Sequence, residues 1–271
     1  MMKYSVIIPI HYSTKYNHFE TALNSVINQT LLPYEIIIIC DGVLEDLIND
    51  FINRTCNSSD RIKFLIFRNE SNIGPGLSRN IGVNNSTTDY IAFMDADDYS
   101  VSNRFELQMN NLFETDIDII GGQIDEYDEN LISLIASRKV PLDNIDIINS
   151  MKFRNSINNV TVLMKKKCFQ QIGGFPNLYF GEDYILWLNA INAGFKIKNI
   201  DITLVKVRTS FQFVEKRLGF NNFKNNIKLL PYLIKNKQVG LFYAIFRVSK
   251  IIILLLLPIF IKKHLFYKYN R

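Results

Sequence analysis

Cysteine is scarce in this 271-residue chain. There are three cysteines, Cys40, Cys56 and Cys168, and no two are close in sequence. Their odd number and wide spacing argue against a disulfide framework or a zinc cluster and suit a reducing compartment. Cys40 ends an apolar run and is most simply explained as a small buried side chain.

The chain also lacks an apolar segment long enough to cross a membrane. The uninterrupted run Ile251–Ile261 has eleven residues, whereas a spanning helix needs roughly 20. Near the N-terminus, Ser5–Ile10 is too short for a signal sequence, and no small-residue cleavage site follows Met1–Tyr4. We therefore expect the protein not to be exported.

Acidic residues are almost missing from the C-terminal part. Residues 211–271 contain twelve Lys or Arg and only Glu215 on the acidic side, a net charge of +11. The whole chain carries +5, so the remainder carries −6. An acidic body with a basic tail predicts an anionic partner for the tail, either nucleic acid or anionic lipid.

Strands and helices alternate over the first hundred residues. Apolar runs predict strands at Val6–Pro9, Tyr34–Cys40, Ile62–Phe67 and Tyr90–Met94. Between them, apolar residues at helical spacing predict helices at Phe19–Asn28, Leu44–Ile52 and Leu77–Asn84. This order predicts an α/β fold around a parallel sheet, in which ligands bind beyond the carboxyl ends of the strands. Shorter strands at Ile117–Ile120 and Val160–Met164 and a helix at Asp183–Ala193 follow.

The last part of the chain has a different character. Residues 216–237 are basic and rich in asparagine, and 239–261 are mostly apolar but include Arg247, Lys250 and Pro258. We interpret this region as a basic amphipathic helix that lies on a membrane. Its long aliphatic runs favour lipid over nucleic acid as the partner. Packing on the catalytic domain, or an oligomer contact, is the alternative.

Carboxylates are concentrated after the fourth predicted strand, in Asp95-Ala96-Asp97-Asp98. Two carboxylates at i and i+2 beyond a strand can converge on one divalent cation, which also takes ligands from substrate phosphates. Aspartate is equally common in plain turns, so this short motif alone leaves both interpretations open.

Two further segments could bind or activate a substrate. In Asn72–Asn80, a glycine-containing loop precedes Arg79 near a helix start, and its amides and guanidinium could bind an anion. Gly181-Glu182-Asp183 precedes a predicted helix, so its carboxylates could serve either as a general base or as helix caps.

Taken in this order and spacing, these segments resemble family 2 glycosyltransferases, which have the GT-A fold, over roughly residues 4–210. The resemblance rests on Ser5-Val6-Ile7-Ile8-Pro9, Ser25-Val26-Ile27-Asn28-Gln29-Thr30, Asp41-Gly42, Asn72-Ile73-Gly74-Pro75-Gly76, Ser78-Arg79-Asn80, Asp95-Ala96-Asp97-Asp98, Ile172-Gly173-Gly174-Phe175 and Gly181-Glu182-Asp183. The tail, with Leu257-Pro258 and Tyr267, is similar to bacterial members that build exopolysaccharide or O-antigen repeats, including amylovoran-type enzymes.

The resemblance implies roles for individual residues. Asp183 would be the catalytic base, with Glu182 and Trp187 on the acceptor side. Asp95 and Asp97 would bind Mn²⁺ or Mg²⁺. The residues expected at the nucleotide-sugar donor are Pro9, Tyr12, Asp41, Asn72, Gly74, Arg79 and Asp95. Many relatives carry a histidine shortly after Arg208, but Thr209 and Ser210 stand there in this chain, so a metal ligand from that region is not expected.

The resemblance implies an inverting glycosyltransferase that uses a nucleotide-sugar, with UDP as the expected nucleotide, and the tail predicts a saccharide acceptor linked to a lipid. We expect a catalytic domain at 1–210, divided into a nucleotide-binding half (1–100) and an acceptor half (101–210), and a membrane-associating tail at 211–271. The protein would lie on the cytoplasmic face of the cell membrane and bind no nucleic acid. A sugar nucleotidyltransferase and a basic-tailed nucleic-acid binder are the alternatives.

Overall fold

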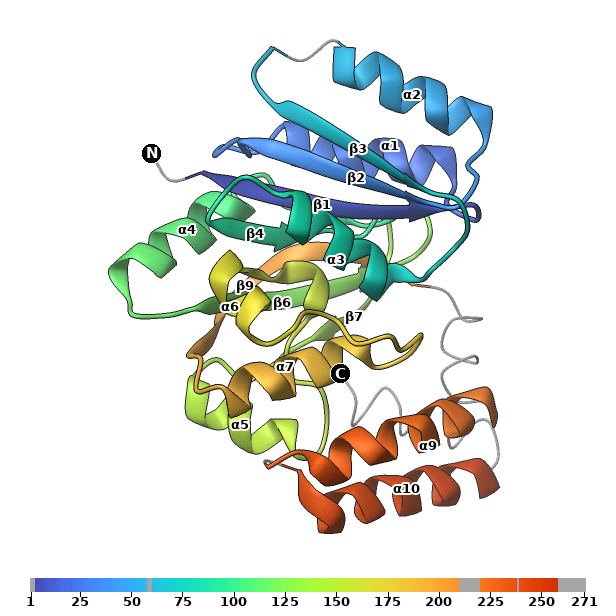
Figure 1. The fold of residues 1–271 in the computed structure, drawn as a ribbon, viewed down its shortest axis with the longest axis vertical. Helices are drawn as coiled ribbons and strands as arrows, with labels where there is room; N and C mark the ends of the chain where they lie inside the picture. The colour runs from blue at the N-terminus through green and yellow to red at the C-terminus, as the bar shows by residue number, and fades with distance from the viewer. Residues whose placement is uncertain (1–2, 58–59, 210–219, 238, 258–271) are drawn as a thin grey trace.

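A mixed β-sheet runs through the molecule, with helices on both of its faces (Figure 1). The computed structural model describes residues 3–57, 60–209, 220–237 and 239–257. Side chains of the central strand alternate between two cores: Val6 and Ile8 point into one, and Ile7 points into the other. This alternation buries both faces of the strand, which explains why its sequence is continuously apolar.

Four strands form the parallel part of the sheet, in the order β3 (Lys63–Asn69), β2 (Glu35–Asp41), β1 (Tyr4–His11) and β4 (Tyr90–Phe93). The helices between them are α1 (Tyr16–Ile27), α2 (Asp46–Asn57) and α3 (Pro75–Asn85). The predicted alternation of strands and helices is therefore confirmed, and the carboxyl ends of these strands meet at one edge of the sheet.

One predicted boundary was wrong. We expected the first strand to end at Pro9, but β1 continues to His11. Pairing with β4 reaches only Ile7, whereas pairing with β2 continues from Pro9 to His11. At Pro9, β1 therefore pairs with a neighbouring strand on one side only. Such a position in a sheet tolerates proline, which has no amide hydrogen to donate.

The second half of the chain extends the same sheet. It adds β8 (Leu163–Lys165), β6 (Ile119–Tyr127), β9 (Ile197–Arg208) and β5 (Tyr99–Ser100) beyond β4, and β7 (Leu134–Arg138) pairs with β6. β8 is antiparallel to both of its neighbours, while β6 and β9 are parallel. The accompanying helices are α4 (Arg104–Glu114), α5 (Asn144–Met151), a 3₁₀ turn at Asn159–Thr161, α6 (Lys166–Gln171) and α7 (Glu182–Asn192).

Two further helices, α9 (Phe220–Lys235) and α10 (Gly240–Leu256), lie side by side at one end of the molecule (Figure 1). Leu229, Leu233, Val239 and Ala244 are buried and belong to the same core cluster as the apolar residues of α7. The described part of the tail therefore packs on the catalytic domain, which was the alternative that the sequence left open.

Gly181 shows how close this packing is. It has a left-handed backbone with φ of +73°, and a Cβ at this position would lie 2.7 Å from Leu229 Cδ1. Only glycine fits both the backbone angle and the approach of α9. The predicted domain boundary at residue 210 and the segment 258–271 lie outside the described residues. None of the described helices is long and apolar enough to span a membrane.

Candidate active site

Asp41, at the end of β2, organises the glycine loop that follows β3. Its Oδ1 accepts hydrogen bonds from the Ile73 backbone and the Asn69 side chain, and its Oδ2 accepts one from the Gly74 backbone, each at 2.9 Å. The carboxylate is almost fully buried. Asp41 therefore fixes the shape of the predicted donor loop, including Asn72 and Gly74, just before α3 begins.

Arg79, on the first turns of α3, forms an ion pair with Asp95 directly beyond β4. The Arg79 side chain is only 5% exposed, and its guanidinium carbon lies 5.6 Å from the centroid of the Phe175 ring. Its Nε has no hydrogen-bond partner among the described residues. A buried guanidinium with an unused donor is suited to a phosphate oxygen.

The acidic loop after β4 is anchored by Arg208 at the end of β9. The Arg208 backbone amide donates to Asp98 Oδ1 at 2.9 Å, and its guanidinium donates to the Asp97 carbonyl and, at 2.8 Å, to the Glu129 carbonyl. Asp98 is buried, and burial together with the neighbouring carboxylates raises its pKa well above the usual range. Asp98 thus has a structural role, while Asp97 remains open to solvent.

Asp95 and Asp97 are suited to holding a divalent cation together with a substrate. Desolvation by the surrounding protein and then the charge of Asp95 raise the pKa of Asp97 to about 6, so the two carboxylates repel each other. A cation would relieve that repulsion. No group of three or more potential ligand side chains is arranged around a metal position in the described ranges. Mg²⁺ or Mn²⁺ held by two carboxylates takes its remaining ligands from phosphates and water.

Glu182, the first residue of α7, faces the donor loop. A Cβ added to Gly76 would lie 3.0 Å from Glu182 Cγ, so the glycine allows α3 and α7 to approach each other. Burial, followed by the charge of Asp183, raises the pKa of Glu182 to about 7, and the positive charge of Arg79 opposes this shift. The predicted donor and acceptor residues are therefore neighbours in space.

Asp183, the predicted base, is held from two sides. Asn155 Nδ2 donates to Asp183 Oδ2 and the Tyr184 backbone amide donates to Asp183 Oδ1, both at 2.8 Å. The second bond is typical of a carboxylate at a helix start, and the first orients the group from outside the helix. These contacts hold the carboxylate in one orientation, as a general base requires.

Three predicted residues stand apart from this cluster. Tyr12 is 68% exposed beyond β1, where its ring contacts His11, and Pro9 lies within that strand. Trp187 is fully buried in the core beneath α7, and its indole nitrogen has no hydrogen-bond partner among the described residues. Trp187 lies four residues after Asp183 on the same face of α7, and nearly all of this helix is buried.

Sequence reasoning missed Arg104, which lies fully buried under the acidic loop. It donates to the Phe93 carbonyl at 2.9 Å and to Gln108 Oε1 at 3.1 Å, and so fixes the end of β4. Burial lowers the pKa of Arg104 to about 9. The sequence signal for this role was an arginine among apolar residues at the start of α4. A charge that is buried requires specific hydrogen-bond partners. Asn155 has no comparable local signal.

A shallow hollow of about 220 Å³ lies beside α3 and α6. It contains none of the predicted donor, metal or acid–base residues. Its lining residues are Asn80, Asn84, Phe169, Gln170, Gly173 and Gly174.

Comparisons with solved structures identify the fold. The chain superposes on S. aureus TarS (residues 1–349) in complex with UDP-GlcNAc, with a TM-score of 0.63 and 16% identity, over 93% of this chain and 72% of the other. It also superposes on the mannosyltransferase PcManGT from Pyrobaculum calidifontis in complex with GDP-Man and Mn²⁺, with a TM-score of 0.65 and 12% identity, over 93% and 73%. The GT-A fold expected from the motifs is confirmed.

Curated relatives are similar over nearly their whole length. The amylovoran biosynthesis glycosyltransferase AmsE of Erwinia amylovora is 29% identical over 238 residues, 88% of each chain. The UDP-Gal:alpha-D-GlcNAc-diphosphoundecaprenol beta-1,3-galactosyltransferase of Escherichia coli is 29% identical over 273 residues, covering 99% of this chain and 97% of that protein. Residues 5–166 match the model of the family described as glycosyl transferase family 2. This chain is a glycosyltransferase and belongs to glycosyl transferase family 2.

Proposed function

We propose that this enzyme transfers a sugar from a UDP-sugar to a saccharide carried on a lipid, during assembly of a bacterial surface polysaccharide. The observation that carries the proposal is the meeting of Arg79 and Asp95 with Glu182 and Asp183 across the α3–α7 contact. The E. coli relative, whose name gives a UDP-galactose donor and a lipid diphosphate acceptor, supports the substrate class.

The donor side belongs to residues 1–100. Pro9, Tyr12 and Asp41 would line the nucleobase pocket, and the Asn72–Gly74 loop shaped by Asp41 would contact the nucleotide. Arg79, whose guanidinium is paired with Asp95, would bind a phosphate oxygen. Asp95 and Asp97 would hold Mn²⁺ or Mg²⁺, which when bound neutralises charge on the diphosphate leaving group.

The acceptor side belongs to residues 101–210, and its chemistry is a single displacement with inversion. Asp183 accepts the proton of the acceptor hydroxyl as that oxygen bonds to the anomeric carbon and the bond from this carbon to the diphosphate oxygen breaks. Asn155 keeps the carboxylate oriented during this step. Glu182, whose pKa of about 7 also suits proton transfer, is the second candidate for the base.

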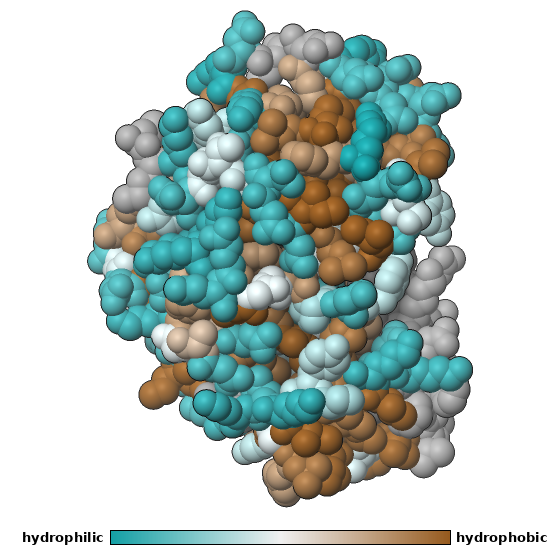
Figure 2. Space-filling model, viewed as in Figure 1, coloured by the Kyte–Doolittle hydropathy of each residue, from teal (hydrophilic) through white to brown (hydrophobic). Residues whose placement is uncertain are grey.

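The outer face of α9 and α10 suits attachment to the inner face of the cell membrane. Apolar side chains gather at the lower end of the molecule, where these two helices lie (Figure 2). On α10, Leu241, Phe242, Ile245, Ile252 and Ile253 are all exposed. Exposed Lys224, Lys228 and Lys235 on α9 would meet anionic headgroups. We propose peripheral binding, in which the lipid carrier and the enzyme share one surface.

The test is a transfer assay with a panel of nucleotide-sugars and a synthetic acceptor, GlcNAc linked through a diphosphate to a short alkyl chain. We expect release of UDP and a product whose anomeric configuration, read by NMR, is inverted relative to the donor. Thermal shift with each donor, with and without Mn²⁺, identifies the bound nucleotide. Hydrolysis of UDP-sugars without transfer to any saccharide would contradict the proposal.

A further inference from the structure

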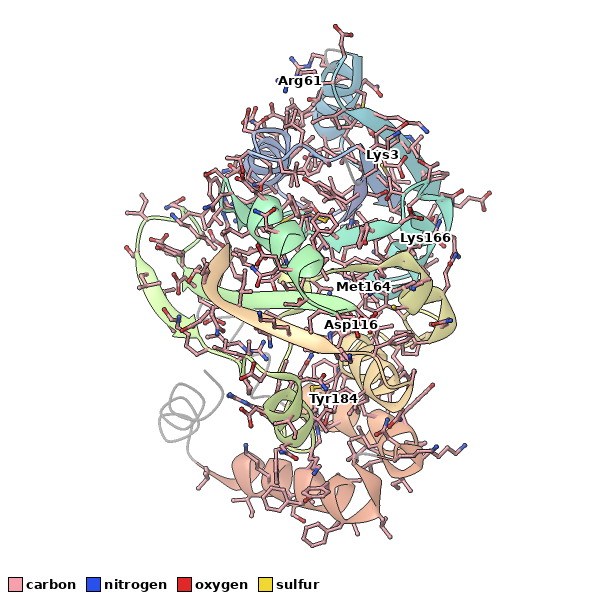
Figure 3. The ribbon with its side chains drawn as sticks, turned by 90° about the vertical axis from the view of Figure 1, so that its left-hand side faces the viewer. Lys3, Arg61, Asp116, Met164, Lys166 and Tyr184 are labelled. Atoms are coloured by element: carbon pink, nitrogen blue, oxygen red, sulfur yellow. The ribbon has the colours of Figure 1, made fainter. Side chains whose placement is uncertain are left out.

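Residues 151–155 join the tail to the catalytic base. The Phe153 ring centroid lies 5.1 Å from that of Tyr243 on α10, and two residues later Asn155 donates to Asp183. The Tyr184 hydroxyl donates to the Met151 carbonyl, and Tyr184 lies between α7 and the C-terminal helices (Figure 3). We call the contact region between residues 151–155, α7 and α10 the seam. Any group bound at this seam is close to the acceptor end of the active site.

Three cations meet at this seam. The guanidinium carbon of Arg247 lies 4.7 Å from the centroid of the Tyr184 ring, and Arg247 Nε donates to Asn226 Oδ1 at 3.1 Å. Lys250 follows three residues later, on the same side of α10. Arg154 comes from the catalytic domain directly after Phe153, whose ring contacts Tyr243 and Phe246 of α10, and its charge acts on Lys250.

The positive charges at this seam have no compensating carboxylate in the part of the chain that the structure describes. Neither Arg154, Arg247 nor Lys250 forms an ion pair there. Partial desolvation and then the charges of Arg247 and Arg154 lower the pKa of Lys250. Like charges held together in this way are stabilised by a bound anion. Guanidinium forks and an ammonium group are the donors that phosphates prefer.

We propose that Arg154, Arg247 and Lys250 bind the diphosphate that links the acceptor saccharide to its lipid carrier. The inference rests on the proposed function, which places an acceptor hydroxyl at Asp183. The anion would then lie on the far side of Asn155, between the base and the apolar face of α10. An acceptor with its lipid in the membrane and its sugar at Asp183 must pass its phosphates through this region.

The experiment compares two soluble acceptors that share one sugar. The first is linked through a diphosphate to a short alkyl chain, and the second is the alkyl glycoside without phosphate. We expect the wild type to prefer the diphosphate acceptor, measured as the ratio of the two kcat/KM values. Lys250→Gln and Arg154→Gln should each reduce this ratio about 10- to 100-fold, the effect of losing a hydrogen bond to a charged group. Lys167→Gln, an exposed lysine on α6, is the matched control and should retain the ratio.

The outcomes separate the possible explanations. If the variants slow both acceptors equally, these residues are structural and the inference is wrong. If the ratio is unchanged while binding to phosphatidylglycerol vesicles is lost, the cations bind membrane headgroups and the inference is again wrong. A wild type that uses both acceptors equally would overturn the diphosphate site alone, whereas one that uses neither would contradict the proposed function. Thermal melting of each variant confirms that it is folded.

Discussion

Asn155 donates a 2.8 Å hydrogen bond to Asp183 across 28 residues of chain. The bond connects the loop after α5 to the first turn of α7 and orients a carboxylate that also accepts a hydrogen bond from the Tyr184 amide of its own helix. A helix cap alone needs no such external partner, so this contact favours a chemical role for Asp183.

Asp183→Asn should reduce transfer by about 10²- to 10⁴-fold, the usual cost of removing a general base. Binding of the UDP-sugar, measured by calorimetry, should remain, because the donor residues lie on other elements. Asp146→Asn, on the exposed side of α5, is the control and should retain activity. Transfer within a few-fold of wild type would mean that Asp183 only caps α7 and that Glu182 is the stronger candidate.

Asp97→Asn should abolish cation-dependent nucleotide binding and leave the fold intact. The physical reason is that Asp97 is the open carboxylate of the Asp95 and Asp97 pair, whereas Asp95 is already bound to Arg79. Calorimetric titration with UDP in Mn²⁺ and in EDTA measures the effect. Asp116→Asn, an exposed carboxylate paired with Lys196, should bind UDP as the wild type does. Equal UDP affinity of the wild type in Mn²⁺ and in EDTA would contradict the metal site.

Glu182→Gln should stabilise the protein in a pH-dependent way. The folded state holds the Glu182 proton up to a pKa of about 7, above the ordinary value of 4.5. The folded state therefore binds more protons in this range, and the stability of the wild type decreases as pH rises from about 4.5 to about 7. The melting temperature of the variant should exceed that of the wild type by a margin that grows over this range and is constant above it. Glu114→Gln, at the exposed end of α4, should show no growing margin.

Leu229→Ala should destabilise the catalytic domain itself. Leu229 is fully buried and its Cδ1 packs against Gly181, so truncation leaves a cavity beside the first turn of α7. We expect a loss of about 2–5 kcal/mol in the free energy of unfolding. Ile234→Ala, on the same helix but 45% exposed, should change it by less than about 0.5 kcal/mol. Equal effects of both substitutions in urea denaturation would show that α9 does not belong to the core.

Phe242→Ser and Ile245→Ser should weaken binding to anionic vesicles without affecting the fold. Their side chains are 75% and 56% exposed. The transfer of each side chain from water into the headgroup region would contribute about 1.5–3 kcal/mol to the binding free energy. Co-sedimentation with phosphatidylglycerol vesicles measures the loss. Leu47→Ser, on α2 at the other end of the molecule, is an equally exposed control (Figure 1). Unchanged sedimentation of the variants would contradict membrane binding through the exposed face of α10.

The first half of the fold was predictable because β1, β2 and β4 are buried on both faces and each is one apolar run in the sequence. In the second half, the strands predicted at Ile117–Ile120 and Val160–Met164 overlap only parts of β6 and β8, and β5, β7 and β9 were missed. β6 contains Gly121 and Gly122, and its pairing with β9 shifts register on either side of Gln123. The extra residues lie in β9, where the partners of Gly122, Gln123 and Ile124 are Ile200, Thr203 and Val205, so β9 has no regular alternation in its sequence.

The residues of the candidate active site were likewise predictable only in part. The positions of Asp41 and Asp95 at one edge of the sheet were predictable, because residues that follow neighbouring parallel strands meet there. The burial of Trp187 was not predictable, because it depends on what packs against α7. Asn155 was missed because its partner lies far away in sequence and its own segment has no periodic pattern.

The contact between Gly181 and Leu229 restricts how parts of this enzyme can be exchanged with those of its relatives. A chimera that joins the N-terminal strands of one transferase to the C-terminal helices of another would bring a foreign side chain against a glycine that tolerates no Cβ. Recombination points within β4 or β8 keep α7, α9 and α10 from the same parent protein, and such hybrids should fold. Crossovers between α7 and α9 should produce insoluble protein unless Leu229 is exchanged together with its glycine.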